Sequence, residues 1–183
     1  MEQGEKMEKT NKSKIEVAYF AAGCFWGVEK SFFEFLKSKE NNKDNKEPKT
    51  EVGYMGGDDS ILDVNYEIVC SGKTEHAETV KIIYDSNKVS YGNLLDLFFR
   101  LHNPTEKDRQ GPDIGNQYRS VIFYTTEEQK KEAEEKIKKE KIKYSTLGKV
   151  VYTELIDGRK KKFYKAEDYH QRYFQRHEVY CHI

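Results

Sequence analysis

The chain has 183 residues, of which 36% are hydrophobic and 35% are charged, and its basic and acidic side chains balance to a formal net charge of zero. This length is typical of a single domain with its own core, and a zero net charge provides no overall field to recruit nucleic acid or an anionic membrane. No apolar run approaches the roughly 18 residues that span a bilayer. Residues 1–14 are charged and lack the apolar centre of a signal peptide, so we expect cytoplasmic residence.

Apolar runs bounded by turn residues predict how the rest of the chain folds. In chain order the expected elements are a strand at 15–22, a helix at 28–36, a polar surface loop at 37–50, a short strand or turn at 52–57, an apolar run at 64–70, a strand at 79–84, a helix at 91–101, a long loop at 102–118, a strand at 120–125, a charged helix from 127 to about 143 and a strand at 150–156. Strands and helices alternate irregularly, which favours an α+β or mixed α/β fold over a doubly wound sheet. We expect one catalytic domain at 15–183, preceded by a disordered leader at 1–14 and ending in a mobile tail.

The segment Gly23-Cys24-Phe25-Trp26-Gly27 joins the first expected strand to the first expected helix. A thiol at the start of a helix meets free backbone N–H groups and the positive end of the helix dipole, and both favour the thiolate. The two aromatic rings beside it, one of them the only tryptophan of the chain, would form an apolar wall for a small group. The pattern therefore indicates a nucleophilic Cys24, although it also fits a buried structural cysteine.

Further on, Tyr66, Glu78, Asp113 and Tyr118 are candidates for a polar counterpart to that wall. Burial would raise the pKa of Glu78 and keep its carboxyl neutral, so that it could donate a proton. The two phenols could donate hydrogen bonds to a polar oxygen. Each residue also has an ordinary structural explanation, and nothing in the pattern alone brings the four together.

Three cysteines are present, Cys24, Cys70 and Cys181, and they form no Cys-x-x-Cys pair. An odd number without secretory features argues against a disulfide framework, and a thioredoxin-like motif is excluded. Cys70 lies in an apolar run and is predicted to be a small buried hydrophobe. Cys181 lies near the end of the sequence, where a mobile thiol either meets an oxidised cysteine or is incidental. His177, Cys181 and His182 have roughly ligand-like spacing, but without a second cysteine pair we expect neither a metal nor a cofactor.

Several of these segments resemble one enzyme family. The segment at 23–27 resembles the active-site motif of peptide methionine sulfoxide reductases of the A class. Further segments resemble that family's other motifs in the same order, at 53–57, 66–78, 108–120 and 163–171. Four ordered motifs are far more specific than the pentapeptide alone, and the match covers about residues 15–173 without the tract at 37–50.

The resemblance implies an α+β fold, a two-layer sandwich in which a mixed sheet with a ferredoxin-like core is flanked by helices. It implies that Cys24 attacks the sulfoxide sulfur and becomes a sulfenic acid as methionine leaves. The other implied roles are methyl binding by Phe25 and Trp26, oxygen binding by Tyr66, Glu78 and Tyr118 with Glu78 as proton donor, and substrate binding by Asp113. A sulfoxide sulfur is a poor electrophile until its oxygen is protonated, so a neutral acid opposite a thiolate makes chemical sense.

The resemblance also implies partners. The substrate would be the S epimer of methionine sulfoxide, free or in proteins, and the role would be repair of oxidised proteins. Cys181 would form a disulfide with Cys24, and thioredoxin would reduce it. We expect a monomer that binds neither nucleic acid nor a membrane.

Some positions depart from the family's usual pattern. Glu75 stands where glycine is usual and adds a charge near Glu78, Asn116 replaces a common threonine, residues 63–65 lack the usual Pro-Thr, and the 37–50 tract lengthens a short connection. None of these changes removes a proposed catalytic group.

Two other functions remain open. One is a thiol peroxidase or hydrolase that uses Cys24, for which the sequence shows no evident partner histidine. The other is a non-enzymatic module whose aromatic pocket captures methionine-containing peptides.

Overall fold

The computed structural model describes residues 13–39 and 47–178. Cys181 and nearly all of the predicted leader therefore lie outside the described residues. Within the described ranges, no helix is both long and apolar enough to cross a membrane.

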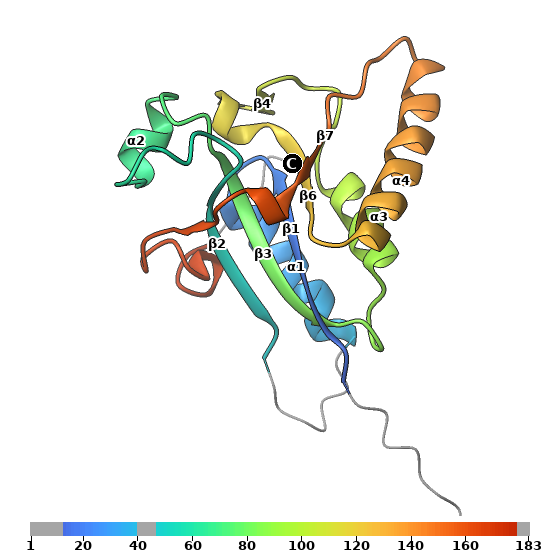
Figure 1. The fold of residues 1–183 in the computed structure, drawn as a ribbon, viewed down its shortest axis with the longest axis horizontal. Coiled ribbons are helices and arrows are strands. Elements are labelled where there is room, and N and C mark those ends of the chain that lie inside the picture. Colours follow the sequence, from blue (N-terminus) through green and yellow to red (C-terminus); the bar gives the residue numbers. More distant parts are fainter. Residues whose placement is uncertain (1–12, 40–46, 179–183) are drawn as a thin grey trace, which may run out of the picture.

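A six-stranded mixed sheet forms the centre of the molecule (Figure 1). Its strands, in spatial order, are β7 (Glu154–Asp157), β6 (Ser120–Tyr124), β1 (Ile15–Ala22), β3 (Ala77–Asp85), β2 (Lys49–Met55) and β8 (Tyr164–Lys165). All neighbours are antiparallel except β6 and β7. The helices are α1 (Phe25–Lys39), α2 (Tyr66–Cys70), α3 (Tyr91–Leu101) and α4 (Glu127–Ser145), with short 3₁₀ helices η1 (Asn116–Tyr118), η2 (Gly158–Lys160) and η3 (Tyr173–Gln175), and a separate ribbon of β4 (Arg109–Gln110) and β5 (Asp113–Ile114).

The core of this sheet is ferredoxin-like, as the resemblance implies. Strands β1, β2, β3 and β6, with α1 after β1 and α3 after β3, give a βαββαβ order in which the four strands lie as 4-1-3-2. The α+β prediction is confirmed.

The two faces of β1 contribute to two different clusters of buried side chains. Side chains alternate along a strand, so Ala18 and Phe20 point to one face and Tyr19 and Ala21 to the other. On the first face, α1 and α3 close the main core. On the second face, Phe163 packs on Tyr19 with ring centroids 5.4 Å apart, so the segment after η2 covers it.

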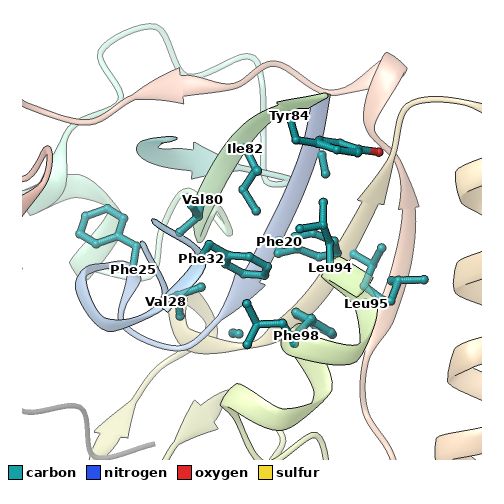
Figure 2. Close-up of a cluster of buried hydrophobic side chains, with 14 of the residues drawn as sticks. Phe20, Phe25, Val28, Phe32, Val80, Ile82, Tyr84, Leu94, Leu95 and Phe98 are labelled. Carbon is teal, nitrogen blue, oxygen red and sulfur yellow. The ribbon is translucent and has the colours of Figure 1, made fainter. Parts of the chain in front are cut away.

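Phe20 is the centre of the main core. Its ring lies 5.3 Å from Phe32 of α1 and 5.2 Å from Phe98 of α3, centroid to centroid, and all three side chains are fully buried. Figure 2 shows these rings together with apolar side chains of β3 between the helices and the sheet. This cluster fixes α1, and with it the turn that carries Cys24.

Replacing Phe98 by alanine is therefore expected to destabilise the protein by about 3–5 kcal/mol, because the deletion leaves a cavity in a core that holds α3 to β1. Urea unfolding followed by circular dichroism measures the change. The control is Leu62→Ala, since Leu62 is 87% exposed and its loss should change stability by no more than about 0.5 kcal/mol. Equal effects of the two substitutions would contradict the assignment of the core.

Candidate active site

Cys24 lies where β1 ends and α1 begins, as the sequence predicts. Gly23 makes the turn with φ +97°, and a Cβ at that position would lie 2.8 Å from a neighbouring side chain, so a larger residue would be strained there. The backbone N–H groups of Trp26 and Gly27 reach the sulfur of Cys24. These are the free donors expected in the first turn of a helix.

The predicted thiolate is, however, not the resting state of this site. Burial raises the pKa of Cys24 to about 12, and the negative charges of Glu78 and Asp113 act in the same direction. The N–H groups of Trp26 and Gly27 lower the pKa but are outweighed. The sequence correctly predicts the N–H donors at the Cys24 thiol. It does not predict that burial affects the Cys24 pKa more than these donors do, because desolvation arises only when the chain folds.

Glu78 is the buried acid of the site. It lies on β3, its side chain is 2% exposed, and its Oε2 accepts a hydrogen bond from the N–H of Phe25 at 2.9 Å. Burial raises the pKa of Glu78 to about 8, the Phe25 N–H opposes the shift, and the charge of Asp113 adds to it. At neutral pH the carboxyl is thus protonated, as expected from the sequence, and it binds the residue that follows Cys24.

Two phenols lie within electrostatic range of Glu78. Tyr66 begins α2 and Tyr118 ends η1. Burial raises the pKa of both hydroxyls, and the charge of Glu78 raises each of them further. The charge of Cys24 also acts on Tyr66. The fold therefore brings thiol, carboxyl and phenols from four separate elements into mutual electrostatic range.

Asp113 reaches this group from the β4–β5 ribbon. Its charge raises the pKa of Cys24, Glu78 and Tyr118. Of the eight site residues predicted from the sequence, the structure describes seven, and Cys181 is the exception. Asp113 joins the cluster although it lies 35 positions after Glu78 in the sequence. Asp113 is therefore part of the electrostatic environment of the thiol and the carboxyl.

An aromatic wall forms the other side of the site. Phe25 is 1% exposed, and its ring lies 6.5 Å from that of partly buried Trp26. Tyr173 of η3 stacks on the Trp26 indole with centroids 3.8 Å apart and planes 7° from parallel. The Nε1–H of Trp26 donates to Nδ1 of His170 at 3.1 Å. Phe25 and Trp26 together form this wall, and Tyr173 and His170 hold Trp26 in place.

Sequence reasoning missed the support of this wall. Glu167 accepts hydrogen bonds from the Tyr66 N–H at 2.9 Å and from the Tyr54 hydroxyl at 3.0 Å, and the Tyr54 ring lies 5.8 Å from that of Phe25. Glu167 and His170 belong to the segment at 163–171 that carries the family resemblance, which was a usable signal. Their roles were not readable because their partners lie over 100 positions away.

The prediction for Cys70 is wrong. Cys70 ends α2 and is exposed, and within that helix only Val69 is buried. A five-residue helix held at its start by Asn65 and Glu167 buries one side chain and leaves the next in solvent. The Tyr66 hydroxyl donates a hydrogen bond to the Cys70 sulfur, which adds to the effect of burial in raising the pKa of that phenol.

Glu75 occupies a left-handed backbone conformation, with φ +55°. Glycine adopts this conformation without strain, which gives a physical reason for the glycine usual in the family. The side chain is exposed. The groups that shift the pKa of Glu78 do not include it, so the expected influence of Glu75 on Glu78 is not seen.

In the described part of the chain, no cluster of three or more His, Cys, Asp or Glu side chains could hold a metal ion. The terminal Cys181 and His182, which suggested ligand-like spacing, lie outside the described ranges.

Comparisons with known proteins agree on one family. A family model described as peptide methionine sulfoxide reductase matches residues 16–183. The peptide methionine sulfoxide reductase MsrA of Methanosarcina acetivorans is 43% identical over 189 residues, covering 96% of this chain and 93% of the relative. The crystal structure of reduced Mxr1 from Saccharomyces cerevisiae superposes with a TM-score of 0.80 at 31% identity, covering 94% of this chain and 93% of Mxr1. Mxr1 in complex with Trx2 gives 0.57 at 23% identity over 92% and 91%, a likeness of fold alone.

Proposed function

Because the chain belongs to the peptide methionine sulfoxide reductase family, A class, and is therefore an oxidoreductase, we propose that Cys24 takes the oxygen from the S epimer of methionine sulfoxide, free or in proteins. The observation that carries the assignment is the pairing of a thiol at the start of α1 with a neutral, buried carboxyl of Glu78 bound to the next backbone N–H. A thiol and a proton donor at one point are what a sulfoxide needs.

The reaction balances without a cofactor. Glu78 gives its proton to the sulfoxide oxygen, which makes the sulfur electrophilic. The sulfur of Cys24 attacks as its own proton leaves, the oxygen passes to Cys24, and Glu78 regains a proton. The sum is thiol plus sulfoxide giving sulfenic acid plus thioether, so that Cys24 is oxidised by two electrons and methionine is formed.

The two sides of the site supply the stereochemistry. Phe25 and Trp26 take the methyl group, and Tyr66, Glu78 and Tyr118 take the oxygen. Asp113 supports the bound substrate from the ribbon. A chiral sulfur with its methyl and oxygen fixed on opposite sides leaves one direction for the peptide, so only one epimer presents its sulfur to Cys24.

Recovery of Cys24 needs a second thiol, for which we propose Cys181. The thiol attacks the sulfenic sulfur and releases water, and thioredoxin reduces the resulting disulfide. Support comes from described neighbours: His177 stacks on Tyr173 at 4.1 Å, and Tyr173 stacks on Trp26. Cys181 follows His177 by four positions, at most about 14 Å of extended chain. Mxr1 has been solved with Trx2 bound, which supports thioredoxin as the reductant here.

The other functions have less support. A thiol peroxidase or hydrolase needs a base for Cys24, but the buried histidines have other partners: His76 accepts from the Gly57 N–H, His102 binds Ser120, and His170 accepts from Trp26. A binding module does not require a buried neutral acid facing a thiol. Cytoplasmic residence and a monomeric state remain predictions from composition.

One assay tests the function. Wild-type protein is incubated separately with the S and R epimers of methionine sulfoxide and dithiothreitol, and the methionine formed is measured. We expect repeated turnover of the S epimer and, because the wall and the oxygen side cannot be exchanged, at least about a hundredfold lower turnover of the R epimer. Failure to turn over the S epimer would overturn the proposal.

A further inference from the structure

His170 is a buried imidazole that the proposed reaction does not use. Its side chain is 2% exposed, and its ring lies within 4.1–5.5 Å of the rings of Tyr169, Tyr66, Phe25 and Trp26, centroid to centroid. It therefore sits between the aromatic wall and the residue that begins α2 on the oxygen side. Burying the polar nitrogens of an imidazole among aromatic rings costs free energy unless they form hydrogen bonds.

Its hydrogen bond fixes which nitrogen carries the proton. Nδ1 accepts from the Nε1–H of Trp26 at 3.1 Å, so Nδ1 is unprotonated and the neutral ring carries its proton on Nε2. Among the residues that the structure describes, Nε2 is buried with no hydrogen-bond partner, and it lies 3.9 Å from Oε2 of Glu167. Protonation of Nδ1 would set one N–H against another and abolish the bond to Trp26.

The hydrogen bond from Trp26 to His170 restricts a rotation of the indole that stacking does not. The parallel stack of Tyr173 on Trp26 holds the plane of the indole but is permissive about rotation within that plane. Nε1–H is the only polar group of the indole, and its bond to His170 removes this rotation.

We propose that His170 is a positioning residue that sets the orientation of Trp26, and thereby the shape of the methyl-binding wall, only in its neutral form with the proton on Nε2. The proposal rests on the proposed function for its effect on substrate, while the orientation of Trp26 is measurable without any substrate.

The charged and titratable groups that face the ring set its pH range. Glu167 faces Nε2, Tyr66 and Tyr169 pack on the ring, and α1 contributes only Phe25 and Trp26, which do not titrate. Burial lowers the pKa of His170 from its usual 6.5, and the charge of Glu167 opposes this. The neutral form, and the bond to Trp26, therefore persist at neutral pH and are lost only as the pH falls below about 6.5.

Substitution of His170 by asparagine or by glutamine distinguishes the loss of the hydrogen-bond acceptor from the loss of side-chain volume. Asparagine places its oxygen near the position of Nδ1, whereas glutamine places its oxygen near that of Nε2. We expect His170→Asn to keep the Trp26 bond and His170→Gln to lose it. In single-turnover experiments with the S epimer, His170→Gln should raise the half-saturating substrate concentration about tenfold, the effect of one lost hydrogen bond, with the limiting rate changed less than about twofold. His170→Asn should stay within about twofold in both.

Fluorescence provides the independent readout, because Trp26 is the only tryptophan. In the wild type, emission should change reversibly with a midpoint below pH 6.5, and acrylamide should quench more strongly below it. His170→Asn should show no such transition, and His170→Gln should resemble the low-pH wild type at every pH. Circular dichroism verifies that each variant is folded.

A wild-type emission without a transition, or one that persists unchanged in His170→Asn, would overturn the proposal. So would equal effects of the asparagine and glutamine variants on substrate saturation. If the fluorescence follows expectation while no variant reduces sulfoxide, the positioning role stands and the proposed function fails, so the two outcomes are distinguishable.

Discussion

Replacing Glu78 by glutamine is expected to slow single-turnover reduction of the S epimer by about 10² to 10⁴-fold, the range for loss of a general acid. The amide keeps the size of the side chain and an oxygen to accept the Phe25 N–H, but it cannot give a proton to the sulfoxide oxygen. Rapid-quench measurement of methionine formed per enzyme, without reductant, isolates this step from recycling of Cys24.

The same substitution should leave the protein at least as stable, which separates chemistry from folding. The pKa of Glu78 is about 8 in the folded protein and ordinary in the unfolded chain. A carboxyl with a raised folded pKa contributes its stability below the unfolded pKa, near 4.5, and loses it as the pH rises toward 8. Glutamine does not titrate, so the unfolding free energy of Glu78→Gln, relative to that of the wild type, should increase between about pH 5 and 8 and stay constant above that range.

A matched control is available on α4. Glu140 is a buried glutamate like Glu78, but it pairs with Lys136 and Lys143 at 3.2 and 3.3 Å. Glu140→Gln should leave the single-turnover rate within about twofold of wild type. A Cys24→Ser variant sets the background. A rate for Glu78→Gln within about threefold of wild type would remove Glu78 from the proton transfer.

The fold was largely readable from local pattern, and its errors occur where local pattern is ambiguous. Predicted helix 91–101 matches α3 because Ser90 and Asn93 form a capping box around an apolar stripe. The polar tract at 37–50 is shorter than predicted at both ends. Lys37 and Lys39 continue α1, since basic side chains suit the end of a helix, and residues 49 and 50 pair in β2.

Pairing partners decide the other boundaries. The predicted strand at 150–156 starts only at Glu154, where pairing with β6 begins, and Tyr152 instead donates its N–H to the Pro104 carbonyl. The predicted loop at 102–118 contains the β4–β5 ribbon and η1. Such contacts depend on chain that is distant in sequence, and no local periodicity encodes them.

The features of the site likewise fall into those that the sequence predicts and those that depend on the folded chain. The strand–turn–helix position of Cys24 follows from local pattern, and the raised pKa of Glu78 follows from chemistry once that residue is known to be buried. The high pKa of the thiol and the exposure of Cys70 do not, because each depends on how much of the fold surrounds a sulfur. The Trp26–His170 bond spans 144 positions, so it becomes visible only in the folded chain.

Replacing Cys181 by serine is expected to abolish thioredoxin-supported turnover while leaving one full turnover intact. The first half of the reaction needs only the site around Cys24, so a rapid-quench burst should still give about one methionine per enzyme. Without the Cys181 thiol the oxidised Cys24 stays a sulfenic acid, which a disulfide-exchanging reductant does not recognise. Thiol titration after one turnover with the S epimer should show one free thiol in both proteins, starting from three in the wild type and two in the variant. Only the variant should then be labelled by a sulfenic acid reagent such as dimedone.

Cys70 provides the matched control, because it is exposed and its thiol contacts Tyr66 at the edge of the same site. Serine keeps a hydroxyl that can bond to Tyr66, so Cys70→Ser should retain thioredoxin-supported turnover within about threefold of wild type. If Cys70→Ser loses that turnover and Cys181→Ser keeps it, the resolving thiol is Cys70. If both variants turn over normally, thioredoxin reduces Cys24 directly and the disulfide step is wrong. The pair of variants therefore distinguishes a tail that delivers its own thiol from a site that exposes one on α2.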